Sequence, residues 1–362
     1  MAADLFSRVE PAWINAPGTM NPADSIALLS CVRLRRNIKG FSFPWKCGKS
    51  ALYDSAAILL GSIGRSVTWQ HCDFRMLDSM DSMSRNLLLE MRLITPLHAQ
   101  GGPGRFFLRD EDCTATCMIN EEDHLVVSAM TAGLDLASVR ERAEAHVSSL
   151  EVDYVYDAVL GYLTADPRHV GSAMRAGVLL HLPALDALKE MENVCAAFER
   201  NWDRLALYKL LSDEQNASGS FYLVSNGSTL AVTPEEIVQH VTDAAESLIS
   251  KEIFARDKIL QSKDPKLNDR LWRAWGLLRH ARRLSFSEAL EAFSFVKLGS
   301  DLGWLPPIDD GAWKRMVAGS QRYHLGAESE QIVTPADEPF FRATRFRQFI
   351  EHRSVSAAAG TD

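Results

Sequence analysis

Met118-Ile119-Asn120-Glu121-Glu122-Asp123-His124-Leu125 sets a short acidic segment between two apolar runs. The flanking residues 114–119 and 125–130 predict two strands joined by a tight turn. Such a turn at the rim of a sheet would project Glu121 and Glu122, which could hold a cationic substrate or remove its proton. The same pattern also fits a solvated hairpin tip without chemistry, so the rest of the chain has to decide between the two interpretations.

The composition predicts a globular protein of about two domains. The chain has 362 residues, 46% hydrophobic and 24% charged, with a net charge of −8. An acidic balance argues against a general nucleic-acid binder. No apolar run reaches the roughly 18 residues of a membrane span, and the N-terminus lacks a secretion signal. We therefore expect a cytoplasmic protein that binds neither nucleic acid nor membrane.

The cysteines point the same way. Six of them are scattered along the chain, which is typical of a reducing compartment. Cys113 and Cys117 lie four residues apart with His124 nearby, so a metal site is conceivable. No second closely spaced cysteine pair completes a ligand set, and the sequence therefore predicts no metal site.

Hydrophobic spacing divides residues 1–255 into two lobes. A small helical lobe is expected over residues 1–98, with helices near 50–64 and 76–93. An α/β lobe is expected over residues 99–255. Its predicted strands are 106–108, 114–119, 125–130, 154–163 and 221–225, its predicted helices include 172–200, and residues 28–34 add an extended segment.

The motif Thr233-Pro234-Glu235-Glu236 predicts the N-terminus of a helix. Thr233 is the expected N-cap, and Glu236 can close a capping box. That helix is expected to reach about residue 260. Helical spacing then continues through 267–284, 286–298 and 311–323. The prediction is a separate helical domain over residues 256–350, followed by a disordered tail at 351–362.

Four further segments follow in order: SCVRLRRN (30–37), GYLTADPRHVGSAMRA (161–176), the polar loop 213–219 and FYLVSNGSTL (221–230). With the acidic turn and His181-Leu182-Pro183-Ala184-Leu185, they resemble the guanidino (phosphagen) kinase family. Within it they are most similar to the bacterial protein-arginine kinases, whose patterns include SSRIRLARN, NEEDHLR and HLPAL. The resemblance spans about residues 23–330, including the helical domain.

The resemblance implies an α+β fold: a small helical lobe, an antiparallel sheet flanked by helices, and a C-terminal helical domain. It implies phosphoryl transfer from MgATP to a guanidinium nitrogen, with arginines clamping the phosphates and carboxylates holding the guanidinium. The expected substrates are protein arginine residues or Arg-rich segments. A homodimer, a zinc-binding activator and Clp-type protease machinery are the partners that the resemblance suggests.

The guanidinium side of the family site is retained. Glu121 and Glu122 match the family, Asp166 stands at the family cysteine, and Asp213 aligns with the loop glutamate. The resemblance implies that all four bind the guanidinium. Glu121, Glu122 and Asp213 are the expected catalytic carboxylates.

The phosphate side departs from the family. Of five clamp arginines, Arg33 and Arg175 are present, while Cys31, Val126 and Tyr208 stand at the other three positions. Losing one preorganised donor costs roughly 10²–10³ in rate. The sequence therefore predicts an impaired kinase, a pseudokinase that acts as an arginine-binding or scaffold protein. The alternative is an active protein-arginine kinase with a rebuilt phosphate site.

Candidate replacements for the missing cations are Arg35, Arg36, Arg168 and Lys209. Arg35 shares a strand face with Arg33 if that segment is extended. A third interpretation is a structural dimer that uses only its helical domain.

Two further positions depart from the family. Arg92 stands where the protein-arginine kinases carry an adenine-side histidine. In the helical domain, the phosphoarginine-binding pattern RDxxRA aligns with residues 338–343, of which only Arg342 and Ala343 match. With Glu338 in place of an arginine, that regulatory pocket is predicted to be lost.

Overall fold

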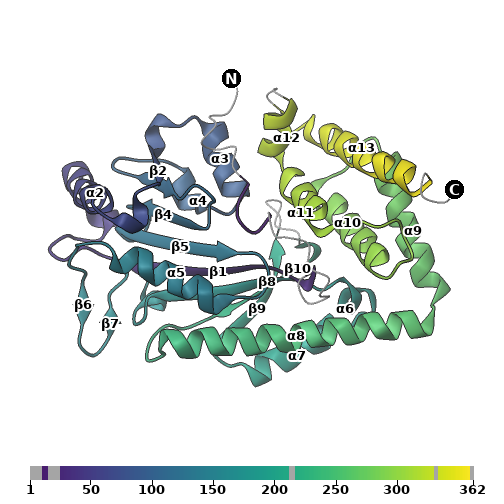
Figure 1. Ribbon diagram of the computed structural model, residues 1–362, viewed down its shortest axis with the longest axis horizontal. Coiled ribbons are helices and arrows are strands. Elements are labelled where there is room, and N and C mark those ends of the chain that lie inside the picture. Colours follow the sequence, from purple (N-terminus) through teal and green to yellow (C-terminus); the bar gives the residue numbers. More distant parts are fainter. Residues whose placement is uncertain (1–9, 15–24, 212–216, 330–332, 359–362) are drawn as a thin grey trace.

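The computed structural model describes residues 10–14, 25–211, 217–329 and 333–358. Its centre is an eight-stranded antiparallel sheet in the order β2-β3-β4-β5-β1-β8-β10-β9 (Figure 1). The strands are β1 Ala27–Arg36, β2 Asp73–Met76, β3 Phe106–Arg109, β4 Ala115–Ile119, β5 Leu125–Thr131, β8 Met174–His181, β9 Leu205–Leu211 and β10 Ala217–Asn226.

Helices cover one face of the sheet. Helix α5 (Leu136–Ser148) packs on β1 and β5, and α8 (Pro234–Ser262) packs on β8 and β10, with α6 (Pro183–Ala187) and α7 (Met191–Asn201) beside them. The helical lobe contributes α2 (Lys49–Ile63), α3 (Ser82–Glu90) and α4 (Pro96–Ala99). Short 3-10 turns are η2 Pro44–Lys46, η3 Val67–Trp69, η4 Leu77–Ser79 and η5 Pro167–His169.

Two sequence predictions in the α/β lobe were wrong. The predicted helix 172–200 begins as the strand β8, and only its second part is helical, as α6 and α7. Strand β8 lies between β1 and β10 and is buried on both faces, so its apolar run lacks the alternation that marks a half-exposed strand. The predicted strand 154–163 is a hairpin of β6 (Tyr156–Asp157) and β7 (Gly161–Tyr162).

The long helix α8 starts as its sequence predicted. Thr233 Oγ1 accepts from the Glu236 backbone N–H at 3.2 Å, and the Glu236 carboxylate accepts from the Thr233 N–H at 2.8 Å. The helix runs 29 residues without interruption through the predicted domain boundary at residue 255. One continuous rod therefore connects the α/β lobe to the helical domain (Figure 1).

The helical domain contains α9 (Pro265–His280), α10 (Phe286–Asp301), α11 (Asp310–Gly319), α12 (Arg322–Ser329) and α13 (Glu338–Ala358). The three helices expected from spacing are confirmed. The predicted disordered tail from residue 351 was wrong for residues 351–358, which continue α13.

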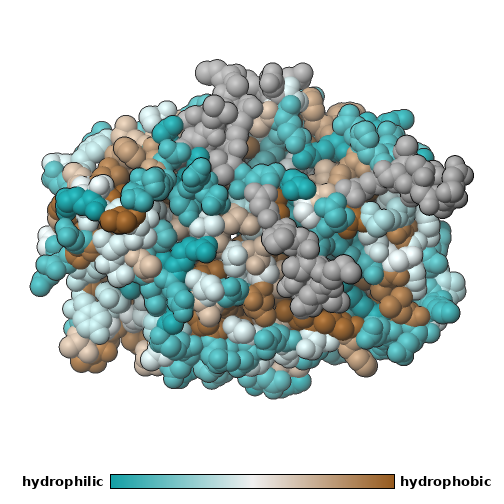
Figure 2. Space-filling view, viewed as in Figure 1, coloured by the Kyte–Doolittle hydropathy of each residue, from teal (hydrophilic) through white to brown (hydrophobic). Residues whose placement is uncertain are grey.

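The helical domain packs against the sheet and the helical lobe. Helix α10 contacts β10, where the Ser220 N–H donates to Ser294 Oγ at 3.2 Å, and α12 contacts α3. Hydrophilic side chains cover most of the face seen in Figure 2, with apolar side chains in a band near α8. Within the described part of the chain, no helix has the length and apolar character to cross a membrane.

Candidate active site

The acidic turn between β4 and β5 is buried and held in place. Asn120 adopts a left-handed conformation (φ 56°), which asparagine tolerates better than most residues. Its amide donates to the backbone oxygens of Leu52 (2.8 Å) and Gly104 (2.9 Å), and Ser55 donates to its oxygen (3.1 Å). The interpretation as a solvated hairpin tip is therefore wrong.

Asp123 points inward from this turn. One carboxylate oxygen accepts from Asn37 Nδ2 (2.6 Å) and from the Ala165 N–H (2.7 Å), while Arg35 Nε lies 3.6 Å from the other. Burial raises the pKa of Asp123. His124 accepts from the Ile38 N–H, and burial lowers its pKa to about 4, so a neutral imidazole fits this role. These contacts connect the turn to the end of β1.

Glu121, Glu122 and Asp166 line one cavity of about 670 Å³. The structure therefore brings together three of the four predicted guanidinium-binding carboxylates. The fourth, Asp213, lies outside the described residues. A cavity of this size accommodates an arginine side chain together with part of the segment that carries it.

The three carboxylates differ in environment. Glu121 accepts from Thr95 Oγ1 at 2.7 Å and from the Glu122 backbone N–H at 2.8 Å, so both its oxygens are oriented. Burial, and then the neighbouring Glu121 carboxylate, raise the pKa of Glu122. The affinity of Glu122 for a proton is therefore raised, as a general base requires.

Asp166 already holds a guanidinium. Arg168 donates to it from Nη2 at 2.6 Å and from Nε at 2.9 and 3.1 Å, and these bonds lower the pKa of Asp166 to about 2. The Arg168 side chain is 81% exposed, so this pair forms at the mouth of the cavity. Asp166 can thus bind a guanidinium, and a substrate arginine would compete with Arg168 for it.

Trp45, on η2, also lines this cavity although its side chain is 72% exposed. Its loop is anchored by Phe41, whose ring packs edge-on against His124 at a centroid distance of 5.9 Å. Sequence reasoning missed this residue. The sequence feature that could have indicated it is an aromatic residue in a Pro- and Gly-containing loop after β1. Such loops lie on the surface and often carry binding residues.

Next to the acidic cavity, Arg33 and Arg175 stand opposite each other on β1 and β8. Arg33 Nε donates to Ser128 Oγ at 2.9 Å, and Arg175 Nη2 donates to Ser225 Oγ at 3.1 Å. Two cations on neighbouring strands can pair with the oxygens of a phosphate chain. Both arginines predicted to remain from the family clamp thus share one face of the sheet.

The three substituted clamp positions lie on the same face. Cys31 precedes Arg33 by two residues on β1, and burial raises the pKa of its thiol, which keeps it uncharged. Val126 on β5 is fully buried, and Tyr208 on β9 lies 3.5 Å from Arg175. None of these side chains provides a cation.

Three of the candidate replacement cations do not point toward the sheet face that bears Arg33 and Arg175. Arg36 lies on the opposite face, with its guanidinium 3.5 Å from the centre of the Tyr162 ring. Lys209 also points to the opposite face and pairs with Asp186 at 3.3 Å. Arg168 is engaged by Asp166. Strand alternation turns Arg36 and Lys209 away from the face that bears Arg33 and Arg175, and ion pairing holds Arg168 at Asp166, so of the four candidates Arg35 alone shares that face.

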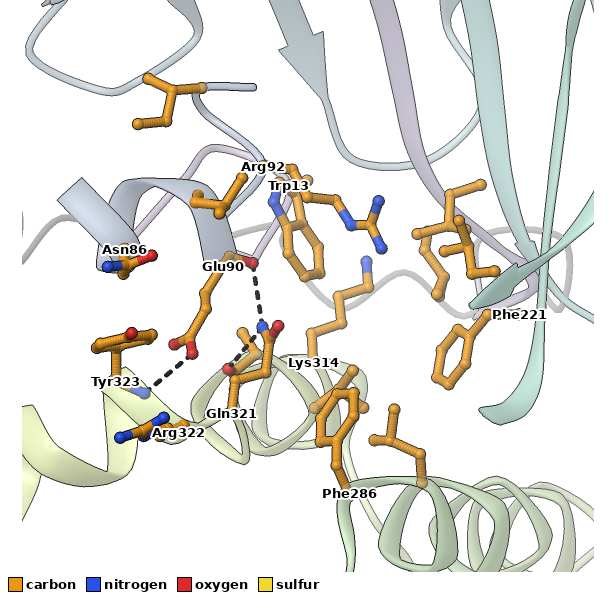
Figure 3. Close-up of a pocket in the computed structure, with 18 of the residues that line it drawn as sticks. Trp13, Asn86, Glu90, Arg92, Phe221, Phe286, Lys314, Gln321, Arg322 and Tyr323 are labelled. Atoms are coloured by element: carbon orange, nitrogen blue, oxygen red, sulfur yellow. Dashed lines mark hydrogen bonds between the residues drawn. The ribbon is translucent and has the colours of Figure 1, made fainter. Parts of the chain in front are cut away.

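A second cavity, of about 730 Å³, lies between the sheet, α3 and the helical domain. Its lining includes the cationic side chains of Arg33, Arg92, Lys314 and Arg322, and Trp13 and Phe221 are among its apolar residues. In Figure 3, the ends of the Arg92 and Lys314 side chains approach one another beside the Trp13 ring. Thr95, which orients Glu121, lines this cavity too, so the segment around it separates the two cavities.

Contacts between α3 and the start of α12 close one side of this second cavity (Figure 3). The Glu90 carboxylate accepts from the backbone N–H groups of Tyr323 (2.9 Å) and His324 (3.1 Å), and His324 Nδ1 lies 2.6 Å from it. Gln321 donates to the Glu90 carbonyl at 3.0 Å. The cavity is thus enclosed by residues far apart in sequence.

At the predicted phosphoarginine pocket, Arg342 is buried and used internally. It donates to the carbonyls of Ser320 (2.8 Å) and Leu284 (3.0 Å) and pairs with Glu338. The loss of the regulatory pocket stays a prediction. Among the described residues, no group of three or more His, Cys, Asp or Glu side chains is placed to hold a metal ion.

Comparisons with known proteins agree along most of the chain. Residues 63–255 match the ATP:guanido phosphotransferase C-terminal catalytic domain, and residues 264–359 match the protein-arginine kinase McsB C-terminal domain. A protein-arginine kinase of Halothermothrix orenii is 30% identical over 94% of this chain and 96% of its own length. One of Syntrophomonas wolfei is 31% identical over 96% and 97%, respectively.

Solved structures show the same fold at lower identity. Lombricine kinase matches with a TM-score of 0.56 at 21% identity, covering 73% of each chain. The duplicated taurocyamine kinase of Schistosoma mansoni, with bound transition state analog components, matches with a TM-score of 0.53 at 22% identity. That match covers 70% of this chain and 36% of the other.

Proposed function

This chain belongs to the ATP:guanido phosphotransferase family and is a homologue of the protein-arginine kinases, and on that premise we propose that it phosphorylates protein arginines through a modified phosphate site. The observation that carries the proposal is the acidic cavity of Glu121, Glu122 and Asp166, which adjoins the sheet face bearing Arg33 and Arg175. The family resemblance predicts this arrangement of opposite charges for transfer between MgATP and a guanidinium.

The carboxylates bind and deprotonate the substrate. A guanidinium pairs with carboxylates through two parallel N–H bonds. Glu121 is held by Thr95 and its own backbone neighbour, so it is the positioning carboxylate. Glu122, with its raised pKa, accepts the proton that the attacking nitrogen releases.

The residues beside this cavity fit MgATP in part. MgATP supplies the phosphoryl group, and its Mg²⁺ is usually carried by the phosphates and water with few protein ligands. Arg33 and Arg175 are placed to hold phosphate oxygens, and the 730 Å³ cavity offers the Trp13 ring for a base. With two of five clamp cations retained, we expect weaker nucleotide binding than in relatives that carry all five.

A second candidate is a pseudokinase that binds arginine segments without phosphorylating them. Cys31, Val126 and Tyr208 favour it, since none of the three carries a positive charge. In that case the acidic cavity would still bind a guanidinium, and the phosphate side would not bind MgATP.

Two measurements on the full chain separate the candidates. Calorimetry should show that the protein binds MgATP. Mass spectrometry should then detect phosphoarginine on a basic protein that was incubated with the chain and MgATP. A kinase requires both results. Glu122→Gln should abolish product and leave MgATP binding intact. Binding of Arg-rich but not Lys-rich peptides without product would favour the pseudokinase, and absence of both activities would overturn the proposal.

The dimer, the zinc-binding activator and the Clp-type protease partners remain predictions from the family resemblance. Protein arginines are the substrates that the name of the relatives states for those proteins. The open acidic cavity, with exposed Trp45 at its edge, supports a polypeptide substrate here as well.

A further inference from the structure

Arg35 stands directly opposite Val126 in the sheet. The register pairs Arg33 with Ser128 and Arg35 with Val126 across β1 and β5. Directly paired residues on antiparallel strands point to the same face, with Cβ atoms about 4.5–5.5 Å apart. A cation at position 35 and a cation at position 126 would therefore reach the same region above the sheet.

Arg35 also has donors to offer. Its side chain is 8% exposed, yet Nε and Nη1 have no hydrogen-bond partner among the described residues. The nearest counter-charge is Asp123, at 3.6 Å from Nε, which is longer than a hydrogen bond. Buried guanidinium N–H groups are costly to leave unpaired, and an incoming phosphate oxygen would satisfy them.

The position of Arg35 along β1 lies between the two halves of the site. Arg33, two residues earlier, belongs to the phosphate side. Two residues later, Asn37 bonds Asp123 of the acidic turn, next to Glu122. A phosphoryl group that passes from a nucleotide to a guanidinium in the acidic cavity would pass this point.

We propose that Arg35 takes the role of the arginine absent at position 126 and contacts the phosphoryl group being transferred. The arginine thus lies on β1 instead of on β5, at the directly paired position, and its side chain lies on the same face of the sheet. This inference rests on the proposed kinase function. It changes the number of cations available on this face from two to three: Arg33, Arg35 and Arg175.

The test exploits the strand pairing. Removing Arg35 alone would leave the buried Asp123 carboxylate without its counter-charge, so variants are compared in the Asp123→Asn background. Asp123→Asn/Arg35→Ala should bind MgATP roughly tenfold to hundredfold more weakly than Asp123→Asn, the range for one charge-assisted hydrogen bond. MgADP affinity should change less, because the contact is to the terminal phosphate.

Adding Val126→Arg to that double variant should restore MgATP affinity, since it returns the cation from the opposite strand. Val126→Arg alone should destabilise the fold, because it places a like charge opposite Arg35. If the Asp123→Asn protein binds MgATP and Arg35→Ala changes nothing, or if Val126→Arg fails to rescue, the inference is wrong. If the unsubstituted protein does not bind MgATP, the proposed function itself fails.

Discussion

Tyr208→Arg restores a cation at the edge of the phosphate side, and its effect on MgATP affinity can be worked out. Tyr208 is 39% exposed, with its hydroxyl 3.5 Å from Arg175, so a longer arginine fits without repacking the core. A charged hydrogen bond to phosphate contributes about 1.5–3 kcal/mol. Repulsion from Arg175, about 1 kcal/mol in a solvated setting, is already present in the unbound variant and lowers its stability, so it does not reduce the gain in binding. The gain of about 1.5–3 kcal/mol corresponds to roughly tenfold to hundredfold tighter binding.

Calorimetric titration of MgATP into the variant and the unsubstituted protein measures this gain. Val159→Arg is the matched control, because Val159 is 90% exposed in the β6–β7 hairpin and adds the same charge away from the sheet face. Denaturant unfolding without nucleotide should show the repulsion as a loss of about 1 kcal/mol. Unchanged affinity, or an equal gain from Val159→Arg, would refute the assignment of Tyr208 to the phosphate side.

Three more predictions concern the acidic cavity, each checked by titrating a fluorescent Arg-rich peptide. Glu122 binds a guanidinium only when ionised, so affinity should fall as pH drops through its raised pKa, above the ordinary value of about 4.3; Glu122→Gln should bind weakly with no such pH dependence. Arg168→Gln should free Asp166 and tighten binding up to about fivefold, the range for an exposed ion pair; weaker binding would count against competition. Trp45→Ala should weaken binding roughly fivefold to thirtyfold, as for other aromatic anchors, whereas Phe254→Ala, 68% exposed on α8, should have no effect.

Much of the fold was predictable because its signals are local. The capping box before α8, the strands flanking the acidic turn and the helices after residue 262 each follow from a few adjacent residues. Strand β8 was missed because its environment is set by β1 and β10, which are distant in sequence. A strand covered on both faces carries no alternation for a reader of the sequence to find.

The site likewise has a part that local sequence predicts and a part that depends on residues distant in sequence. Glu121 and Glu122 belong to one contiguous motif, and they line one cavity with Asp166. The pairing of Arg35 with Val126 could not be predicted, since it depends on the register between two strands about 90 residues apart. The ion pair of Arg168 with Asp166 likewise depends on side-chain conformation at η5.

Helix α8 gives the molecule a mechanical property. At about 1.5 Å per residue, its 29 residues form a lever about 43 Å long. Near its far end, Arg256 bonds Asp301 of α10 at 3.1 Å, so the helical domain is fixed to the lever arm. The cavity containing Arg33 and Lys314 has one wall formed by the sheet and α3 and another formed by the helical domain. A load applied to the helical domain by a bound protein would therefore act on the width of that cavity in two ways, through α8 and through the direct contacts of α10 with β10 and of α12 with α3.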